Sequence, residues 1–261
     1  MNINVSIIQF SPVLGNQDQN ISIIKGMLGQ VQGSDLIVLP ELANAGYNFI
    51  SSRQAFESAE DLHESKYLSF LSEEARNKKA FIVSGVCELD GGELYNTAIL
   101  VGPQGLIGKY RKIHLFMNEK DLFRTGNAGL PVFDLPFGKI GMLICFDYLF
   151  PETWRIQAMK GADIICHPAN LLTSNAHKVI PALALMNKIF ILTANRIGTE
   201  GNLTFCGRSF VADPFGDITH ISDDKSASVI NATLDLTLPK NKMITLRNHV
   251  FNDRLPDKYL P

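Results

Sequence analysis

The 261-residue sequence predicts an α/β fold of four layers, built from two similar α/β halves. Short β-rich runs alternate with helical patterns, and the order strand–helix–strand–helix followed by further strands occurs twice along the chain. At 46% hydrophobic and 19% charged residues, the chain can bury a large core, which excludes a disordered or fibrous protein. No linker separates the halves, so we expect a single domain over residues 1–261.

The first half is predicted to contain strands separated by two helices. Leu36 to Leu39 is a short, wholly apolar run, as expected of a strand that is covered on both faces. Apolar residues at helical spacing from Ile21 to Val31 indicate a first helix with Asn20 as its N-cap, and residues 67–75 indicate a second helix. The predicted strands cover residues 5–10, 35–39, 80–87, 94–101 and 106–110.

The second half repeats this order. Residues 131–136 are interpreted as a short turn region. The polar tail over residues 248–261 contains Val250, Phe251 and Leu255, which would be exposed in a frayed end, so an arm that docks on a neighbouring subunit is favoured. The predicted strands cover residues 139–145, 162–167, 189–194, 209–212 and 229–234, and the predicted helices cover residues 152–160 and 177–188.

Composition and motifs restrict the class of protein. A net charge of -2 argues against a protein that binds nucleic acid or an anionic membrane, because both need a basic face. The N-terminus lacks the features of a signal peptide, and no run of about 18 apolar residues occurs. The four cysteines form no C-x-x-C pair, so no zinc or iron–sulfur site of the usual spacing is predicted. We expect a soluble cytoplasmic protein with free thiols.

Cys145 lies where a strand is predicted to lead into a helix. It follows the apolar run 140–144 and precedes Phe146 to Glu152, where the helix begins. A nucleophile at such a turn projects from the sheet, and the following backbone N–H groups can hold negative charge. This position also favours a lowered thiol pKa. A buried structural cysteine is the alternative interpretation, since free cysteines are often buried.

Three charged residues are candidates to complete a site. Glu41 directly follows the predicted strand 35–39, at the edge where ligands bind in open α/β sheets, and its carboxylate could take a proton from a thiol. Lys112 ends a charged run and precedes apolar residues, which would carry its ammonium inward toward a developing oxyanion. Glu119 could orient this lysine or the substrate. The alternatives are a turn-capping surface glutamate for Glu41, a solvated charge run for Lys112 and an exposed helix-start residue for Glu119.

The remaining cysteines and two of the histidines are weaker candidates for a catalytic role. Cys166 and His167 are neighbours on one predicted strand and point to opposite faces, so they cannot pair, and Cys166 is assigned to the core. His114 is interpreted as structural, at the site entrance or a strand end. Cys87 and Cys206 are expected to be inert in apolar strands. The sequence has no G-x-S-x-G, Walker A, G-x-G-x-x-G or H-E-x-x-H motif.

Three segments resemble the signature blocks of the nitrilase superfamily, the carbon–nitrogen hydrolases. They are Pro40-Glu41-Leu42, Lys109 to Leu115 and Cys145 to Glu152, in the family's order, and Cys166 to Leu171 is also similar to a family segment. The similarity extends over nearly the whole chain. It implies an αββα sandwich that pairs into an αββα–αββα dimer, so a homodimer or a higher homo-oligomer is expected, with residues 248–261 as a possible dimer arm.

The same resemblance assigns roles to residues. Cys145 is similar to the family's nucleophile, Glu41 to its general base and Lys112 to its oxyanion stabiliser. Glu119 falls where many members have a second glutamate, and the Phe146 N–H would assist Lys112. No metal or organic cofactor is implied. The residues that flank these positions in sequence, and are therefore candidates for the pocket wall, are Tyr47, Phe116, Phe146 and Asn170.

The predicted function is cysteine-dependent hydrolysis of a non-peptide C–N bond in a small molecule, with release of ammonia. The leading prediction is an ω-amidase-like enzyme acting on a small aliphatic or dicarboxylic monoamide. An aliphatic nitrilase is the second, because the same residues serve both reactions. Further alternatives are an N-carbamoyl amine hydrolase, a non-catalytic binding relative, and an amidotransferase subunit, which would need a partner chain.

Overall fold

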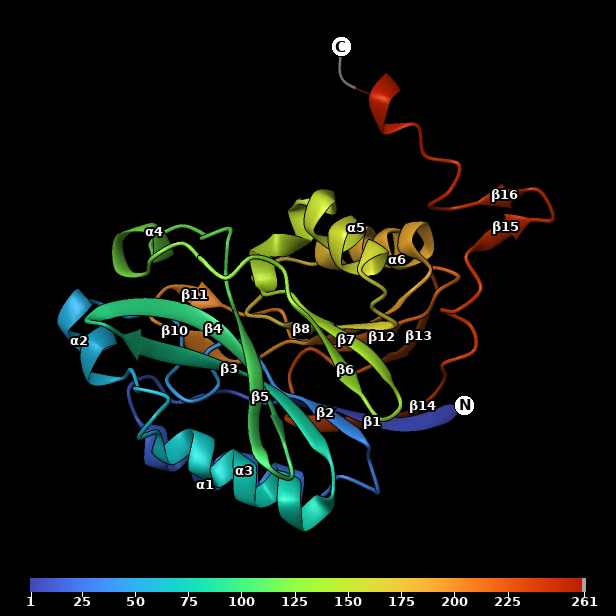
Figure 1. Ribbon diagram of the computed structural model, residues 1–261. Helices are drawn as coiled ribbons and strands as arrows, with labels where there is room; N and C mark the ends of the chain where they lie inside the picture. Colours follow the sequence, from blue (N-terminus) through green and yellow to red (C-terminus); the bar gives the residue numbers. More distant parts are fainter. Residues whose placement is uncertain (260–261) are drawn as a thin grey trace.

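Two six-stranded sheets lie face to face, and helices cover the outer face of each (Figure 1). The computed structural model describes residues 1–259. The first sheet has the order β14 (Ser228–Asp235), β1 (Asn2–Gln9), β2 (Leu36–Val38), β3 (Phe81–Asp90), β4 (Glu93–Gly102) and β5 (Gly105–Arg111), and its outer helices are α1 (Gln17–Leu28) and α3 (Lys66–Lys78). The predicted four-layer α/β fold is therefore confirmed.

The second sheet is built on the same plan. Its order is β13 (Ile218–Ile221), β12 (Phe210–Ala212), β9 (Phe190–Ala194), β8 (Ile164–Pro168), β7 (Gly138–Met142) and β6 (Val132–Leu135). The helices α5 (Pro151–Met159) and α6 (Ala176–Asn187) cover its outer face (Figure 1). The smaller elements are α2 (Ser52–Glu57), α4 (Glu119–Leu122), β10 (Thr199–Glu200), β11 (Leu203–Thr204), β15 (Met243–Thr245), β16 (Asn248–His249), and the 3₁₀ helices η1 (Cys145–Leu149) and η2 (Pro256–Lys258).

The central strands of both sheets are buried on two faces. On β2, Leu36 and Val38 pack in the core between the sheets, whereas Ile37 lies in the core beneath α1 and α3. This alternation explains why the run is apolar throughout. The pairs β1–β2 and β2–β3, like β7–β8 and β8–β9, are parallel, so each sheet brings several carboxyl-terminal strand ends to one edge.

Several local predictions were wrong. Residues 131–136 are not a turn region, because β6 lies there and pairs with β7 in antiparallel register. The strand at the end of the second half, β14, does not join the second sheet. It pairs with β1 and forms an edge of the first sheet. Asn16, not Asn20, caps α1, and Asn20 lies inside the helix with its amide bonded to Val13 and Asn44.

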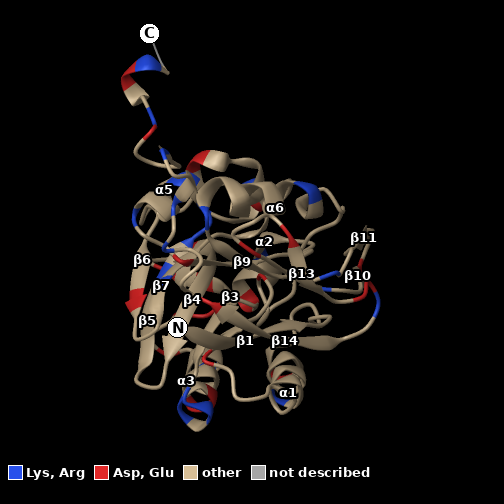
Figure 2. Ribbon diagram, turned by 90° about the vertical axis from the view of Figure 1, so that its right-hand side faces the viewer, with Lys and Arg blue, Asp and Glu red and all other residues tan. Residues whose placement is uncertain are grey.

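The outer helices and the C-terminal tail lie at the surface of the molecule. In Figure 2, α3 carries both signs of charge, in keeping with the small net charge of the chain. After β14 the chain leaves the sheets, and the hairpin β15–β16 and η2 extend beyond α5 (Figure 1). Within residues 1–259, no helix has the length and apolar character needed to cross a membrane.

Candidate active site

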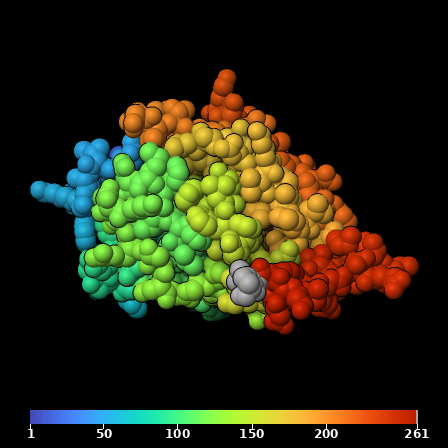
Figure 3. Space-filling model, turned by 90° about the horizontal axis from the view of Figure 1, so that it is seen from above, coloured from blue at the N-terminus to red at the C-terminus, as the bar shows by residue number. Residues whose placement is uncertain are grey.

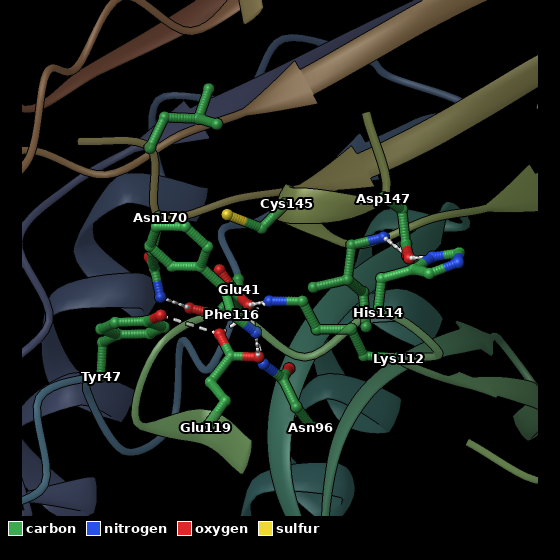
Figure 4. Close-up of polar contacts among 12 residues, drawn as sticks. Glu41, Tyr47, Asn96, Lys112, His114, Phe116, Glu119, Cys145, Asp147 and Asn170 are labelled. Atoms are coloured by element: carbon green, nitrogen blue, oxygen red, sulfur yellow. Dashed lines mark hydrogen bonds and ion pairs between the residues drawn. The ribbon is translucent and has the colours of Figure 1, made fainter. Parts of the chain in front are cut away.

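The carboxyl edges of the two sheets bring the predicted site residues together. Glu41 follows β2, Lys112 follows β5, and Cys145 begins η1 after β7. Glu119 begins α4 and completes the group, in which the side chains point toward a common centre (Figure 4). Residues separated by about a hundred positions thus share one buried polar cluster, because the carboxyl ends of β2 and β5 in one sheet lie close to the carboxyl end of β7 in the other.

Lys112 lies between two carboxylates. Its Nζ donates to Glu41 Oε1 at 2.6 Å and to Glu119 Oε1 at 2.7 Å. The Lys112 and Glu41 side chains are fully buried, and Glu119 is 4% exposed. Burial acts to lower the pKa of Lys112, but the carboxylates of Glu119 and Glu41 outweigh it and raise that pKa well above its usual range. Lys112 is therefore a buried cation held by two carboxylates. This excludes the alternative interpretation of Lys112 as part of a solvated charge run.

Glu119 and Tyr47 extend this network beyond Lys112. The Tyr47 hydroxyl donates to Glu119 Oε1 at 2.8 Å, and the Phe116 N–H donates to Glu119 Oε2 at 3.1 Å. Burial raises the pKa of Glu119 although the Lys112 ammonium opposes it. Glu119 is thus a buried, bonded residue and not an exposed helix-start glutamate.

Glu41 has one oxygen bound and one free. Asn96 Nδ2 donates to Oε1 at 2.7 Å, so this oxygen holds both the amide and the lysine. Oε2 is buried and has no hydrogen-bond partner among residues 1–259. A buried carboxylate oxygen without a donor is costly, and it is an available acceptor for a proton.

Gly85 on β3 lies against the main chain of Glu41. Its N–H donates to Pro40 O at 3.0 Å, and its carbonyl accepts from Ala43 N at 3.1 Å. A Cβ at Gly85 would lie 2.3 Å from Leu42 N and 2.5 Å from Glu41 Cα, so only glycine permits this approach.

The substitution Gly85→Ala is expected to displace Glu41. Overpacking of this kind costs about 1–3 kcal/mol of stability. Because Glu41 is a candidate catalytic group, a shift of about 1 Å in its position is expected to lower turnover roughly 100-fold. Urea unfolding and turnover measure the two effects. Gly26→Ala is the matched control, because nothing lies within 4 Å of a Cβ there. Equal behaviour of the two variants would show that the close packing does not position Glu41.

Cys145 has a left-handed backbone conformation at the start of η1. Its φ is +43°, an uncommon value for a residue other than glycine, and its side chain is 5% exposed. Burial and the Glu41 carboxylate raise the pKa of the Cys145 thiol well above its usual range, whereas Lys112 acts to lower it. The predicted lowering of this pKa is therefore wrong for the free protein, and the thiol needs a base to ionise it.

Asp147 supports the turn that carries Cys145. Its Oδ2 accepts from Ile144 N and from the Tyr110 hydroxyl, each at 2.8 Å. Its Oδ1 bonds His114 Nδ1 at 2.7 Å, and the His114 ring stacks on Phe150 with ring centres 3.5 Å apart. His114 therefore has contacts that support the turn, in agreement with its structural interpretation.

His167 contacts Cys145 through the main chain. Its Nε2 lies 2.9 Å from Cys145 O, and its Nδ1 lies 3.2 Å from Thr193 Oγ1. Since a carbonyl only accepts, Nε2 carries the hydrogen. Burial lowers the pKa of His167 to about 4, so the ring is neutral at pH 7. Cys166 is fully buried, as predicted.

Acid is expected to destabilise the protein through His167. The folded-state pKa lies below the ordinary 6.5, so the unfolded chain binds more protons and stability falls as the pH drops from 6.5 toward 4. The full difference is about 3 kcal/mol. Urea unfolding of the wild type and His167→Gln at pH 7 and pH 4.5 measures it. A pH dependence that is identical in both proteins would contradict this assignment.

A cavity of about 280 Å³ opens on Cys145. Phe116, Phe146 and Asn170, the candidates for the pocket wall, line it, and the Phe116 and Phe146 ring centres are 4.9 Å apart. Tyr47 enters the site through Glu119 instead of lining this cavity. The lining residues that were not predicted are Tyr148, Leu149, Leu171, Leu172, Thr173 and Asn175.

Three supporting residues were also missed by sequence reasoning. Asn96 lies in β4, and the pairing of β4 with β3 brings it to Glu41. Asp147 follows Cys145 by only two positions, so its proximity in the sequence could have identified it as a supporting residue. The position of His167 in the sequence indicated only its nearness to Cys166 and gave no sign of a contact with Cys145. Cys87 lies in β3 as expected, but Cys206 lies in the segment between β11 and β12, outside any strand.

This combination of fold and site defines a class of α/β proteins with a buried thiol beside a carboxylate and an ammonium. The carbon–nitrogen hydrolase family model matches residues 4–240, and the chain belongs to this family. The chain is an enzyme of the nitrilase/amidase type. The predicted membership of the nitrilase superfamily is confirmed.

Three relatives place the chain within this family. It is 43% identical to a nitrilase of Pyrococcus abyssi over 98% of this chain and 99% of that protein. It is 31% identical to the N-carbamoylputrescine amidase of Arabidopsis thaliana over 87% of this chain and 84% of that protein. The structure of the NitN amidase from Nesterenkonia sp. AN1 matches with a TM-score of 0.79 and 25% identity, over 89% of this chain and 93% of that chain.

Proposed function

We propose that Cys145 is the nucleophile, Glu41 the general base and Lys112 the oxyanion stabiliser of an amidase that acts on small, uncharged amides. The observation that supports these roles is the free Glu41 Oε2, a buried acceptor in the polar cluster beside the Cys145 thiol (Figure 4). A thiol with a raised pKa requires such a base before it can attack.

The reaction proceeds through a thioester. Glu41 takes the thiol proton as the Cys145 sulfur bonds to the substrate carbonyl carbon, and the negative charge moves to the carbonyl oxygen. Lys112 and the Phe146 N–H stabilise this oxyanion. The intermediate collapses with cleavage of the C–N bond, and Glu41 returns the proton to the departing ammonia. Glu41 then activates a water that hydrolyses the thioester, which releases the acid and the Cys145 thiol.

Glu119 acts by positioning Lys112. A single carboxylate would draw the ammonium away from the substrate, whereas two carboxylates at 2.6 Å and 2.7 Å hold it between them. The bond from the Tyr47 hydroxyl fixes Glu119 in turn.

The cavity favours an uncharged aliphatic amide. Its walls are mostly apolar and, among the described residues that line it, none is Lys or Arg. A dicarboxylic monoamide carries a free carboxylate that would be buried there without a cation, which is unfavourable. Of the two substrates predicted for an amidase, the small aliphatic monoamide is therefore preferred. Nitrile hydrolysis is the second candidate, and the 43% identity with a nitrilase favours it.

Ammonia release from a matched panel tests this function. The panel contains butyramide, butyronitrile, succinamic acid and N-carbamoylputrescine, each assayed with the wild type and Cys145→Ala. The proposal expects release from butyramide above all, with no release in the variant. Release from butyronitrile or from the carbamoyl compound alone would replace the amidase by the corresponding alternative. Silence across the panel would favour an amidotransferase subunit that needs a partner chain.

We also propose that residues 1–261 act as one domain that forms a homodimer through α5, α6 and the tail. Figure 3 views the molecule from above, the side on which α5 and α6 lie in Figure 1. Ile156 and Met159 of α5 and Leu185 and Met186 of α6 are exposed. The tail contacts α5 through Phe251, whose ring lies 5.1 Å from the Arg155 guanidinium. Residues 260 and 261 of the predicted arm lie outside the described residues. Sedimentation equilibrium of the wild type and Met159→Glu tests the pairing, and a wild-type monomer would refute it.

A further inference from the structure

Asn170 has a fixed orientation beside the catalytic cluster. It follows β8 and is 3% exposed. Its side-chain Nδ2 donates to the main-chain oxygen of Glu41 at 3.1 Å (Figure 4). Because a carbonyl oxygen only accepts, the amide must present its nitrogen to Glu41, and Oδ1 is therefore left as an acceptor on the other side.

That acceptor has no partner of its own. Asn170 Oδ1 is buried and makes no hydrogen bond to any residue from 1 to 259. Asn170 lines the same cavity as Cys145. The other side-chain amide in the lining belongs to Asn175, which is exposed. Asn170 is thus the buried amide of this cavity, and an unpaired buried acceptor is satisfied when a ligand supplies a donor.

We propose that Asn170 Oδ1 accepts a hydrogen bond from the nitrogen of a primary amide and thereby selects amides over nitriles. This inference rests on the proposed amidase function. A primary amide has two N–H donors on the nitrogen that leaves as ammonia, whereas a nitrile has none. A bound nitrile leaves Oδ1 unpaired and directs no donor toward it. Sites built to bond a polar substrate group reject analogues that lack the group.

The test compares butyramide with butyronitrile in the wild type and Asn170→Leu. Removing the acceptor is expected to lower kcat/KM for the amide about tenfold or more, with little change for the nitrile. Asn175→Leu is the matched control, since it removes an exposed amide from the same cavity and should leave the ratio of the two substrates unchanged. An equal fall for both substrates would show that Asn170 only supports the Glu41 main chain, and the proposal would be wrong.

A binding measurement separates this proposal from the proposed function. Calorimetry gives the Kd of both ligands for Cys145→Ala and for Cys145→Ala combined with Asn170→Leu. Weakening of amide binding by about tenfold with unchanged nitrile binding supports the role of Asn170, even if the wild type hydrolyses only the nitrile and the amidase assignment fails. Equal changes, or none, overturn it. Circular dichroism melting of each variant confirms that the fold is retained.

Discussion

Cys145→Ala is expected to abolish turnover and leave the fold intact. The thiol sulfur has no substitute in alanine, and loss of a nucleophile commonly lowers turnover by about 10⁴-fold or more. The main chain at this position is held by the bonds of Asp147 to Ile144 and of His167 to Cys145 O, none of which uses the sulfur. Ammonia release and thermal melting measure the two effects.

Cys166→Ala is the control for this experiment. Cys166 is fully buried in β8, the strand beside β7, and burial alone raises the pKa of its thiol. Its replacement should keep turnover while stability falls, because a core side chain is shortened. If Cys145→Ala retained wild-type turnover, the nucleophile would be another residue and the proposed mechanism would be wrong.

Local pattern was sufficient to predict most elements of the two sheets. The apolar run at β2 and the helical spacing in α3 are local signals, and both elements were predicted within a few residues. The pairing of β14 with β1 joins residues more than two hundred positions apart. The alternation of apolar and polar residues along β14 predicts a strand, but it does not indicate which of the two sheets the strand joins. The same limit applies to β6, whose short, partly exposed sequence resembles a turn region.

The candidate site was predictable where its residues follow strand ends. Glu41, Lys112 and Cys145 each come after a strand. β2 and β5 run in the same direction in the first sheet, although β5 is its edge strand, and β7 belongs to the second sheet. Asn96 lacks this signal, because it lies within β4 and reaches Glu41 through strand pairing. The direction of the Cys145 pKa was missed because the sequence does not show how deeply the thiol is buried or that two carboxylates surround it.

Lys112→Met is expected to impair both turnover and stability. Without the ammonium, two buried carboxylates share a site with only neutral donors, such as Asn96 and Tyr47. Removal of one partner of a buried ion pair costs about 3–5 kcal/mol. Loss of an oxyanion donor lowers turnover about 10²- to 10³-fold. Turnover per folded molecule and urea unfolding separate the two effects.

The pH dependence of this variant has a definite sign. In Lys112→Met the pKa of a buried carboxylate rises above its unfolded value, because burial and the second carboxylate both disfavour the charge. The folded state then binds more protons than the unfolded chain, so the destabilisation is largest near pH 7 and decreases as the pH falls toward 5. A destabilisation that is independent of pH would contradict this electrostatic origin.

Lys109→Met is the matched control, on the same segment of chain. Lys109 is one-third exposed and pairs with Glu88, which keeps Arg111 as a second partner. Its loss should cost at most about 1 kcal/mol and leave turnover unchanged. If Lys112→Met were destabilised but kept wild-type turnover per folded molecule, Lys112 would serve only to neutralise Glu41 and Glu119. The oxyanion would then depend on the main-chain N–H groups at the start of η1, so this pair of variants distinguishes the structural from the catalytic contribution of the lysine.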